Sequence, residues 1–273
     1  MRYSALIIII VLVFAQTSFS QQEINIPKES KKGDFYFYWG WNWSWYTKSD
    51  IGFTGADYDF ILSNVSAKDR PSPFDFDIYF NPKNVTIPQY NFRLGYFFND
   101  HYSITAGIDH MKYVVQTNQA STINGWINGG TDYDGVYVND DITIKKGFLQ
   151  FEHTDGLNYA NIGIRRFDNL FEIGFLKFAI TEGVETGILL PRTNTTLMNK
   201  ERYDEFHLSG YGLSAMVGLN IIVINYFFIQ TELKGGYINM PDIRTTGDTM
   251  DKARQNFWFT QCNILFGFTF NLL

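Results

Sequence analysis

The chain contains a single cysteine, Cys262, among its 273 residues. An internal disulfide bond is therefore impossible, and no cysteine stands near the N-terminus where a lipid anchor could be attached. Beyond residue 20 no apolar run approaches the roughly 20 residues of a membrane helix, and no segment repeats its apolar residues with the helical period. The sequence also lacks a glycine-rich phosphate loop, the Cys/His spacing of a zinc site and any fixed repeat. We predict neither a cofactor nor a bound metal.

Basic residues are also scarce, since 22 lysines and arginines stand against 28 aspartates and glutamates. Residues 1–20 have the layout of a secretory signal peptide: Arg2, an apolar stretch over residues 5–15, and a small-x-small sequence that ends at Ser20. Cleavage there would remove Arg2 and leave a formal charge of 21 − 28 = −7. A chain of this charge is not expected to bind nucleic acid.

Aromatic residues, in contrast, are abundant, with 26 phenylalanines and 17 tyrosines. The mean hydropathy is nevertheless slightly negative, at −0.15. An exported chain that is aromatic-rich, polar on average and without membrane helices is typical of a transmembrane β-barrel, because apolar and polar residues alternate along its strands.

The stretch over residues 34–46 reads DFYFYWGWNWSWY and holds four of the six tryptophans. Successive side chains of a strand point to opposite faces, so a strand here would have one aromatic face and one polar or small face. The aromatic face would consist of Phe35, Phe37, Trp39, Trp41, Trp43 and Trp45. The stretch is longer than a usual strand of roughly 5–6 residues and long enough to cross a bilayer as a tilted strand, which takes roughly 9–11.

The stretch over residues 257–273 alternates in the same way up to the end of the sequence. One face would carry Trp258, Cys262, Ile264, Phe266, Phe268, Phe270 and Leu272, and the other Gln261, Asn263, Gly267, Thr269 and Asn271. This pattern resembles the closing strand of bacterial outer-membrane β-barrel proteins, which usually ends in phenylalanine where this sequence has Leu273. The resemblance implies a location in the bacterial outer membrane, contact with its lipids and insertion by the barrel-insertion machinery.

Ten segments have clear strand character. They are residues 34–46, 57–65, 89–97, 102–115, 148–153, 159–167, 175–189, 206–219, 226–238 and 257–273. Asp155-Gly156 indicates a hairpin between two of them. With ten strands the long 116–145 segment would be periplasmic, against the rule that long loops lie outside the cell. Adding weak strands at 74–80 and 136–144 restores the rule, so the sequence favours twelve strands, with ten as the alternative.

A soluble β-sandwich would show the same alternation. It would, however, expose the aromatic face of residues 34–46 to water, where such a face favours aggregation. In lipid the same face forms the outer wall, and closure of the barrel satisfies the backbone. We therefore predict an all-β protein, in which residues 21–33 form a flexible periplasmic lead-in and residues 34–273 a single transmembrane antiparallel β-barrel.

The two faces of these strands give two sets of candidate residues. We expect the lipid-facing set to include Phe37, Trp39, Trp41, Trp43, Phe266, Phe268 and Phe270. We expect the lumen-lining set to include Asp57, Asp59, Arg93, Asp109, Glu152, Arg165, Lys177, Glu185, Glu232 and Lys234. Because unpaired buried charge is costly, the lumen residues would either pair into a network that fills the barrel or line a water-filled path for small solutes.

His207 and Ser209 form the one pattern that suggests catalysis. Residues i and i+2 of a strand share a face, so an imidazole base and a hydroxyl nucleophile could meet there. The pair resembles the His-x-Ser pair of lipid A 3-O-deacylases, small outer-membrane barrels with a glutamate on the next strand. In this sequence that strand offers Glu232, whose parity points inward, whereas Glu182 on the preceding strand has outward parity.

The sequence thus predicts an outer-membrane β-barrel that is structural or forms a narrow pore for small solutes. One alternative is a membrane-embedded acyl hydrolase that acts on lipid A or phospholipid through His207 and Ser209. Another is a surface protein that binds or adheres through its external loops, at 116–145, 190–205 and 239–255.

Overall fold

The computed structural model describes residues 30–81, 83–84, 87–200 and 205–272. The expected signal peptide over residues 1–20 and most of the expected lead-in over 21–33 lie outside the described residues. All elements named below belong to one compact unit, Lys31–Leu273. In the described part of the chain, no helix has the length and apolar character needed to cross a membrane.

The unit consists of antiparallel strands and, among the described residues, one short helix. The elements in chain order are β1 (Phe35–Tyr46), β2 (Ser49–Gly55), β3 (Tyr58–Val65), β4 (Ala67–Lys68), α2 (Phe76–Phe80), β5 (Tyr90–Phe97), β6 (Tyr102–Val115), β7 (Gln119–Ile127), β8 (Gly135–Ile144), β9 (Leu149–Ile173), β10 (Leu176–Leu189), β11 (Asn194–Leu197), β12 (Gly210–Val223), β13 (Phe227–Arg244) and β14 (Lys252–Phe270).

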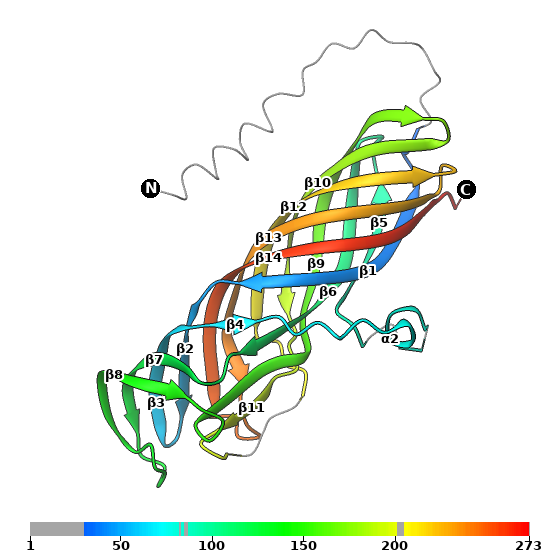
Figure 1. The fold of residues 1–273 in the computed structure, drawn as a ribbon. Coiled ribbons are helices and arrows are strands. Elements are labelled where there is room, and N and C mark those ends of the chain that lie inside the picture. The colour runs from blue at the N-terminus through cyan, green and yellow to red at the C-terminus, as the bar shows by residue number, and fades with distance from the viewer. Residues whose placement is uncertain (1–29, 82, 85–86, 201–204, 273) are drawn as a thin grey trace, which may run out of the picture. The chain divides into compact units, whose positions relative to one another are not determined.

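Eight of the described strands close into a ring, in the order β1-β5-β6-β9-β10-β12-β13-β14 (Figure 1). Pairing between β1 and β14 completes the ring, from Phe35 opposite Phe270 to Tyr46 opposite Phe259. A closed ring has no unpaired strand edge, which is the condition for strands to stand in hydrocarbon.

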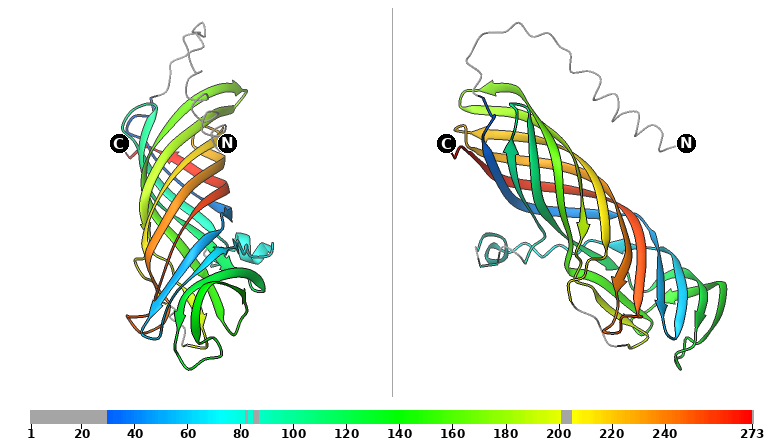
Figure 2. Two further views of the ribbon diagram at one scale, coloured as in Figure 1. Left: turned by 90° about the vertical axis from the view of Figure 1, so that its left-hand side faces the viewer. Right: turned by 180° about the vertical axis from the view of Figure 1, so that it is seen from behind.

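The short turns of the ring all lie at the end where β1 begins and β14 ends. They are residues 98–101 between β5 and β6, 174–175 between β9 and β10, and 224–226 between β12 and β13. The other connections, which include β2, β3, β7 and β8, lie at the opposite end (Figures 1 and 2). In outer-membrane barrels short turns face the periplasm and long connections the exterior. We therefore name these two ends the periplasmic end and the external end.

The predicted count of twelve strands, and the alternative of ten, are wrong for the ring. Predicted strands 148–153 and 159–167 are parts of one strand, β9, because Asp155-Gly156 makes an irregularity within the strand instead of a hairpin. Predicted strand 57–65 is β3, which pairs with β2 and β7 outside the ring. The eight-strand ring itself puts residues 116–145 at the external end and the Asn99-Asp100 turn at the periplasmic end.

The two weak strands also lie outside the ring. Residues 76–80 form the helix α2, whose first turn is capped because the Asp75 carboxylate accepts hydrogen bonds from the amides of Asp77, at 2.8 Å, and Ile78, at 3.2 Å. Residues 135–144 do form a strand, β8, but its only strand partner among the described residues is β7.

The strands β2, β3, β7 and β8 form a sheet that continues from β14 beyond the external end of the ring (Figure 2). The first four residues of β14 pair with β2, from Lys252 opposite Thr54 to Gln255 opposite Ile51. An apolar core of buried side chains lies under this external sheet and between the external parts of β6, β9, β13 and β14. It includes Phe53, Phe60 and Phe151. The external connections are therefore a folded part of the protein with its own core.

Candidate functional site

Six charged side chains from five strands meet inside the ring. Arg93, Arg165 and Lys234 supply three positive charges, and Asp109, Glu185 and Glu232 supply three negative ones. All six side chains are fully buried. The ion pairs are Arg93–Asp109 at 3.1 Å, Arg93–Glu185 at 2.9 Å, Arg165–Glu185 at 2.6 Å, Arg165–Glu232 at 3.0 Å, Lys234–Asp109 at 2.6 Å, Lys234–Glu185 at 2.7 Å and Lys234–Glu232 at 3.7 Å.

Neutral side chains complete this charge network. Arg93 donates hydrogen bonds to the Tyr38 hydroxyl at 2.8 Å and to Asn161 Oδ1 at 2.6 Å. Glu232 accepts hydrogen bonds from Gln230 Nε2 at 2.9 Å and Asn263 Nδ2 at 3.0 Å. These four partners are not among the predicted lumen residues, although each stands at an inward position of its strand. With equal numbers of opposite charges in contact, the network offsets much of the cost of burying its charges.

Packed side chains fill the lumen on both sides of the network. Toward the periplasmic end lies an apolar layer, formed by Tyr36, Phe97, Phe167, Phe228 and Leu265. Toward the external end, Asn91 donates to Gln261 Oε1 at 3.0 Å and accepts a hydrogen bond from Asn42. Beyond these amides, further toward the external end, the apolar core under the external sheet begins.

Four of the ten predicted lumen residues do not join the network. Asp57 and Asp59 lie in the external sheet and its turn, where Asp57 pairs with Lys200 at 3.2 Å. Glu152 lies in the external part of β9 and pairs with Arg70 at 3.2 Å. Lys177 lies beside the periplasmic turn, with Nζ 3.9 Å from Glu172. For Asp59 the predicted face is wrong, because Asp59 is exposed while Tyr58 and Phe60 of the same strand are buried. For Glu152 and Lys177 the strand is right, but the predicted depth along it is wrong.

The seven predicted lipid-facing residues are on outward positions of β1 and β14. Phe37, Phe268 and Phe270 are exposed, whereas Trp39, Trp43 and Phe266 are half-buried. Trp41 is covered, because α2 lies against it with the rings of Tyr79 and Phe80 5.4 and 5.3 Å away.

His207 and Ser209 precede β12 and do not form a nucleophile–base pair. The Ser209 hydroxyl is buried and donates to the backbone carbonyl of His207 at 3.4 Å, not to its imidazole. The imidazole Nε2 instead lies 3.2 Å from the Asp242 carboxylate, which also pairs with Lys252 at 3.0 Å. Partial burial acts to raise the pKa of Asp242, but the hydrogen bonds from Lys252 and His207 hold it below its ordinary value. Neither Glu232, which lies in the lumen, nor Glu182 has a hydrogen bond to His207.

The external sheet carries an apolar patch on its outer face, which we call the external patch and define as Trp126, Val136 and Val138. Val136 and Val138 are 81% and 73% exposed. Trp126 of β7 lies opposite Val136 of β8 and contributes a side chain that is 40% exposed. Two exposed acidic residues share the outer face with the patch: Asp59, opposite Trp126, and Asp141, opposite Thr122.

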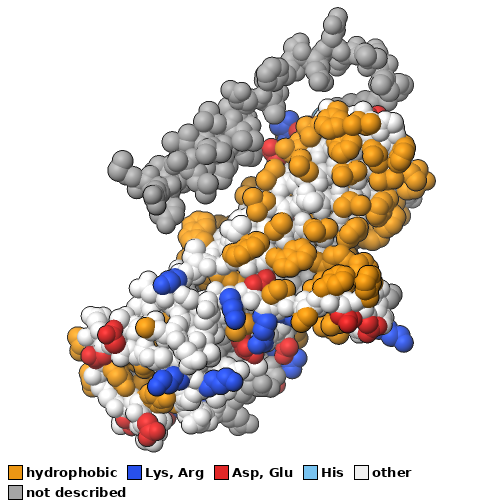
Figure 3. Space-filling view, viewed as in Figure 1, with side chains coloured by type: hydrophobic (Ala, Val, Ile, Leu, Met, Phe, Trp, Pro, Cys, Tyr) orange, Lys and Arg blue, Asp and Glu red, His pale blue; other side chains and the backbone are white. Residues whose placement is uncertain are grey.

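The outer wall of the ring is apolar where the external part of the molecule is polar (Figure 3). Strand β12 illustrates this, since its exposed positions include Leu213, Val217 and Leu219 while the side chains between them are buried. A closed ring with hydrogen-bonded strands inside a wall of exposed apolar side chains is stable only in lipid. The chain therefore has the fold of an outer-membrane β-barrel.

No protein-family model and no curated protein matches the chain. Among solved structures, the outer-membrane protein OprG from Pseudomonas aeruginosa is 10% identical, with 89% of this chain and 98% of that chain covered and a TM-score of 0.39. AlkL, an outer-membrane protein determined in lipid bilayers, is 11% identical over 93% and 98%, also with a TM-score of 0.39. Ail, the attachment invasion locus protein of Yersinia pestis, is 8% identical over 86% and 99%, with a TM-score of 0.30.

Proposed function

We propose that this outer-membrane barrel is a closed anchor that holds the external sheet at the cell surface, and that the sheet binds a protein partner. The observation that carries the proposal is the contrast between the two halves of the molecule. The lumen is filled by the charge network and its flanking layers, while the external strands form a cored sheet with an exposed apolar patch.

The packed lumen favours an anchor over a pore for small solutes. A solute would have to displace fully buried ion pairs such as Arg165–Glu232 and an apolar layer that includes Phe97 and Phe228. Each of these steps is costly, because breaking a buried pair leaves an uncompensated charge in a medium of low polarity. The outward residues of the wall, Phe37, Phe268 and Phe270 among them, would contact outer-membrane lipids.

The chemistry of the external patch indicates the kind of partner. Exposed apolar side chains that are bordered by polar ones mark protein-binding surfaces. Two of the three patch residues, Val136 and Val138, belong to β8. Among the described residues this is the terminal strand of the external sheet, and its free edge offers backbone groups for pairing with an added strand. Because Asp59 and Asp141 share the outer face with the patch, we infer that the partner presents an extended segment in which apolar and basic residues alternate.

Selection of ten-residue peptides displayed on phage, against the refolded protein in lipid nanodiscs, tests this function. We expect enrichment of peptides that alternate apolar residues with lysine or arginine. The double variant Val136→Lys/Val138→Lys should weaken their binding by about tenfold or more, because it puts two positive charges where apolar contacts were made.

The matched control is Thr143→Lys, at another exposed position on the same strand. It should bind the selected peptides nearly as well as the unaltered protein. Selected peptides that bind the double variant and the control equally well would contradict the proposal, as would a selection without any apolar-basic alternation.

A further inference from the structure

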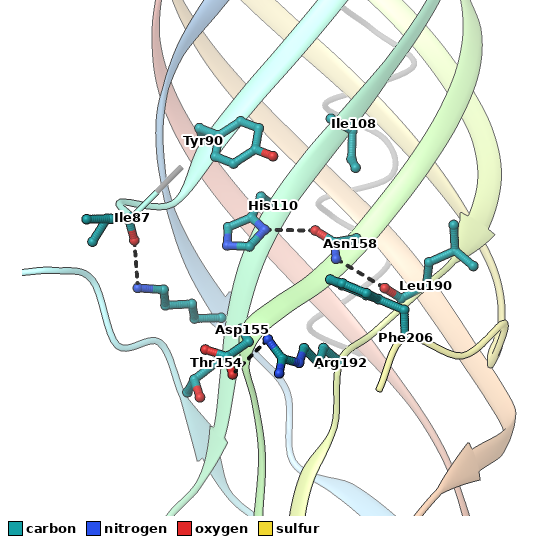
Figure 4. Close-up of a pocket in the computed structure, with 11 residues that line it drawn as sticks. Ile87, Tyr90, Ile108, His110, Thr154, Asp155, Asn158, Leu190, Arg192 and Phe206 are labelled. Atoms are coloured by element: carbon teal, nitrogen blue, oxygen red, sulfur yellow. Dashed lines mark hydrogen bonds and ion pairs between the residues drawn. The ribbon is translucent and has the colours of Figure 1, made fainter. Parts of the chain in front are cut away.

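A pocket of about 680 Å³ lies on the outer wall of the ring, near its external end. We call it the wall pocket. Its floor consists of β5, β6 and β9, and its sides of the segments around Ile87 and around Leu190, Arg192 and Phe206 (Figure 4). The volume lies within the roughly 300–1,000 Å³ of small-molecule sites.

An irregularity in β9 creates this pocket. Met111 of β6 lies opposite Leu157, but Tyr113, two residues further, lies opposite His153. The three residues 154–156 of β9 therefore lie opposite the single residue Lys112, two more than regular pairing would place there. Gly156 takes a φ of +126°, a backbone conformation that favours glycine. Hydrogen bonds then fix the floor, since His110 Nδ1 lies 2.8 Å from Asn158 Oδ1 and Asn158 donates to the Leu190 carbonyl at 3.1 Å.

The lining of the wall pocket changes from apolar to charged along the axis of the barrel. Tyr90 and Ile108 line the side toward the membrane-spanning part of the ring, and Asp155 and Arg192 the side toward the external end (Figure 4). Ile108 continues a row of outward side chains on β6 that includes the exposed Ile104. An amphiphilic lipid in the outer leaflet would place its acyl chains at the apolar side of the pocket and its head group at the charged side.

The charged end of the wall pocket suits an anion. Among the lining residues, Lys112 and Arg192 contribute two positive charges and Asp155 one negative charge. Arg70 and Asp69 also act on Lys112, with opposite signs, so this set of charges is positive by one. The Lys112 ammonium is held in place by the Ile87 carbonyl, at 3.1 Å, and the Ser72 hydroxyl, at 3.4 Å. The Arg192 guanidinium lies 3.8 Å from the Asp155 carboxylate. A phosphodiester, which carries a single negative charge, would balance this set and accept charge-assisted hydrogen bonds from both cations.

We propose that the wall pocket binds one phosphate-bearing lipid of the outer leaflet. The phosphate contacts Lys112 and Arg192, and the acyl chains run over Tyr90, Ile108 and Phe206 onto the apolar wall. The site is independent of the partner proposed for the external sheet, and it uses none of the external-patch residues.

Native mass spectrometry of the folded protein in neutral detergent tests the proposal, with dioleoylphosphatidylglycerol as the probe. We expect one tightly retained lipid for each protein. Lys112→Met/Arg192→Met, which keeps the length of both side chains, should lower the retained fraction by about tenfold or more, since a charge-assisted hydrogen bond contributes about this factor. The matched control Lys48→Ala/Arg254→Ala removes two exposed cations elsewhere at the external end and should retain the lipid.

Two further probes separate the lipid from its parts. Dioleoylglycerol has the chains without the phosphate, and glycerophosphoglycerol has the phosphate without the chains; neither should compete at the concentration at which the whole lipid saturates. If the Met variant misfolds, Ile108→Trp, which fills the apolar end, provides the second test and should also release the lipid. Equal loss in the Met variant and the control, equal binding of dioleoylglycerol, or equal binding of glycerophosphoglycerol would overturn the proposal.

Discussion

Replacement of Glu185 by alanine is expected to destabilise the folded barrel by about 3–5 kcal/mol, the range for removing one partner of a buried ion pair. Glu185 contacts Arg93, Arg165 and Lys234 at 2.9, 2.6 and 2.7 Å. It is the one carboxylate of the network within 3.0 Å of all three cations. Its loss would leave three positive charges against two negative ones in a lumen closed to water.

Urea titration of unfolding in lipid vesicles measures this loss. The matched control is Glu172→Ala, near the periplasmic end of β9, where the side chain is half exposed and lies 3.9 Å from Lys177. A surface pair of this kind contributes roughly 0–1 kcal/mol. If both variants lost less than about 1 kcal/mol, the lumen would be hydrated and the network would not be a sealed interior.

Replacement of Ile164 by arginine is expected to cost about 2–4 kcal/mol in a bilayer, the range for a cation at the middle of a barrel wall. Ile164 lies halfway along the ring part of β9, between Ile104 of β6 and Val184 of β10. All three side chains are more than half exposed, at 52%, 53% and 62%. At such exposed positions in water, a change to arginine would leave the free energy of unfolding nearly unchanged. A loss of about 2–4 kcal/mol would therefore indicate that Ile164 contacts lipid.

Val136→Arg is the matched control, because Val136 is also an aliphatic strand residue and is 81% exposed. It lies in the external sheet, where water faces it, and the change should stay within about 0.5 kcal/mol. Equal unfolding free energies for Ile164→Arg and Val136→Arg in vesicles would show that the two positions share one solvent, which would contradict the membrane-spanning ring.

The alternation of residue types was sufficient to predict the two faces of β1 and β14, although it gave the wrong face for β3, where Asp59 is exposed. Tyr38, Asn42 and Ser44 of β1 are buried, as their parity required, and β1 pairs along its full length with the other stretch that the sequence singled out, β14. Period-two alternation is a local property of the backbone, so it can be detected without knowing which strands are neighbours.

The strand number of the ring could not be predicted in the same way, because it depends on pairing. Asp155-Gly156 is a hairpin signal in the sequence, yet in the structure Gly156 lies within a strand whose neighbours continue on both sides. The same residue pair fits a turn and a strand irregularity, and only the positions of β6 and β10 distinguish them. Likewise, β3 has the alternation of a ring strand but pairs in the external sheet.

The contacts within the candidate sites join residues that are far apart in the sequence, so they were harder to predict than the faces of the strands. The sequence predicted that Arg93, Asp109 and Glu185 face the lumen, but not that they meet at one depth with Lys234. The acid that His207 contacts is Asp242, 35 positions further on, at the end of β13. Lys112 and Arg192 both line the wall pocket, which lies at the irregularity in β9. In the sequence, Asp155-Gly156 at this place predicted a hairpin instead.

The most direct test of the account is the conductance of the purified, refolded protein in a planar bilayer. A barrel whose lumen is sealed by the Arg165–Glu232 and Lys234–Asp109 ion pairs and by the apolar layer around Tyr36 should give no stable open currents. Stable, ion-selective currents from the unaltered protein would mean that the lumen is a hydrated path, and the function would then be that of a pore instead of a closed anchor.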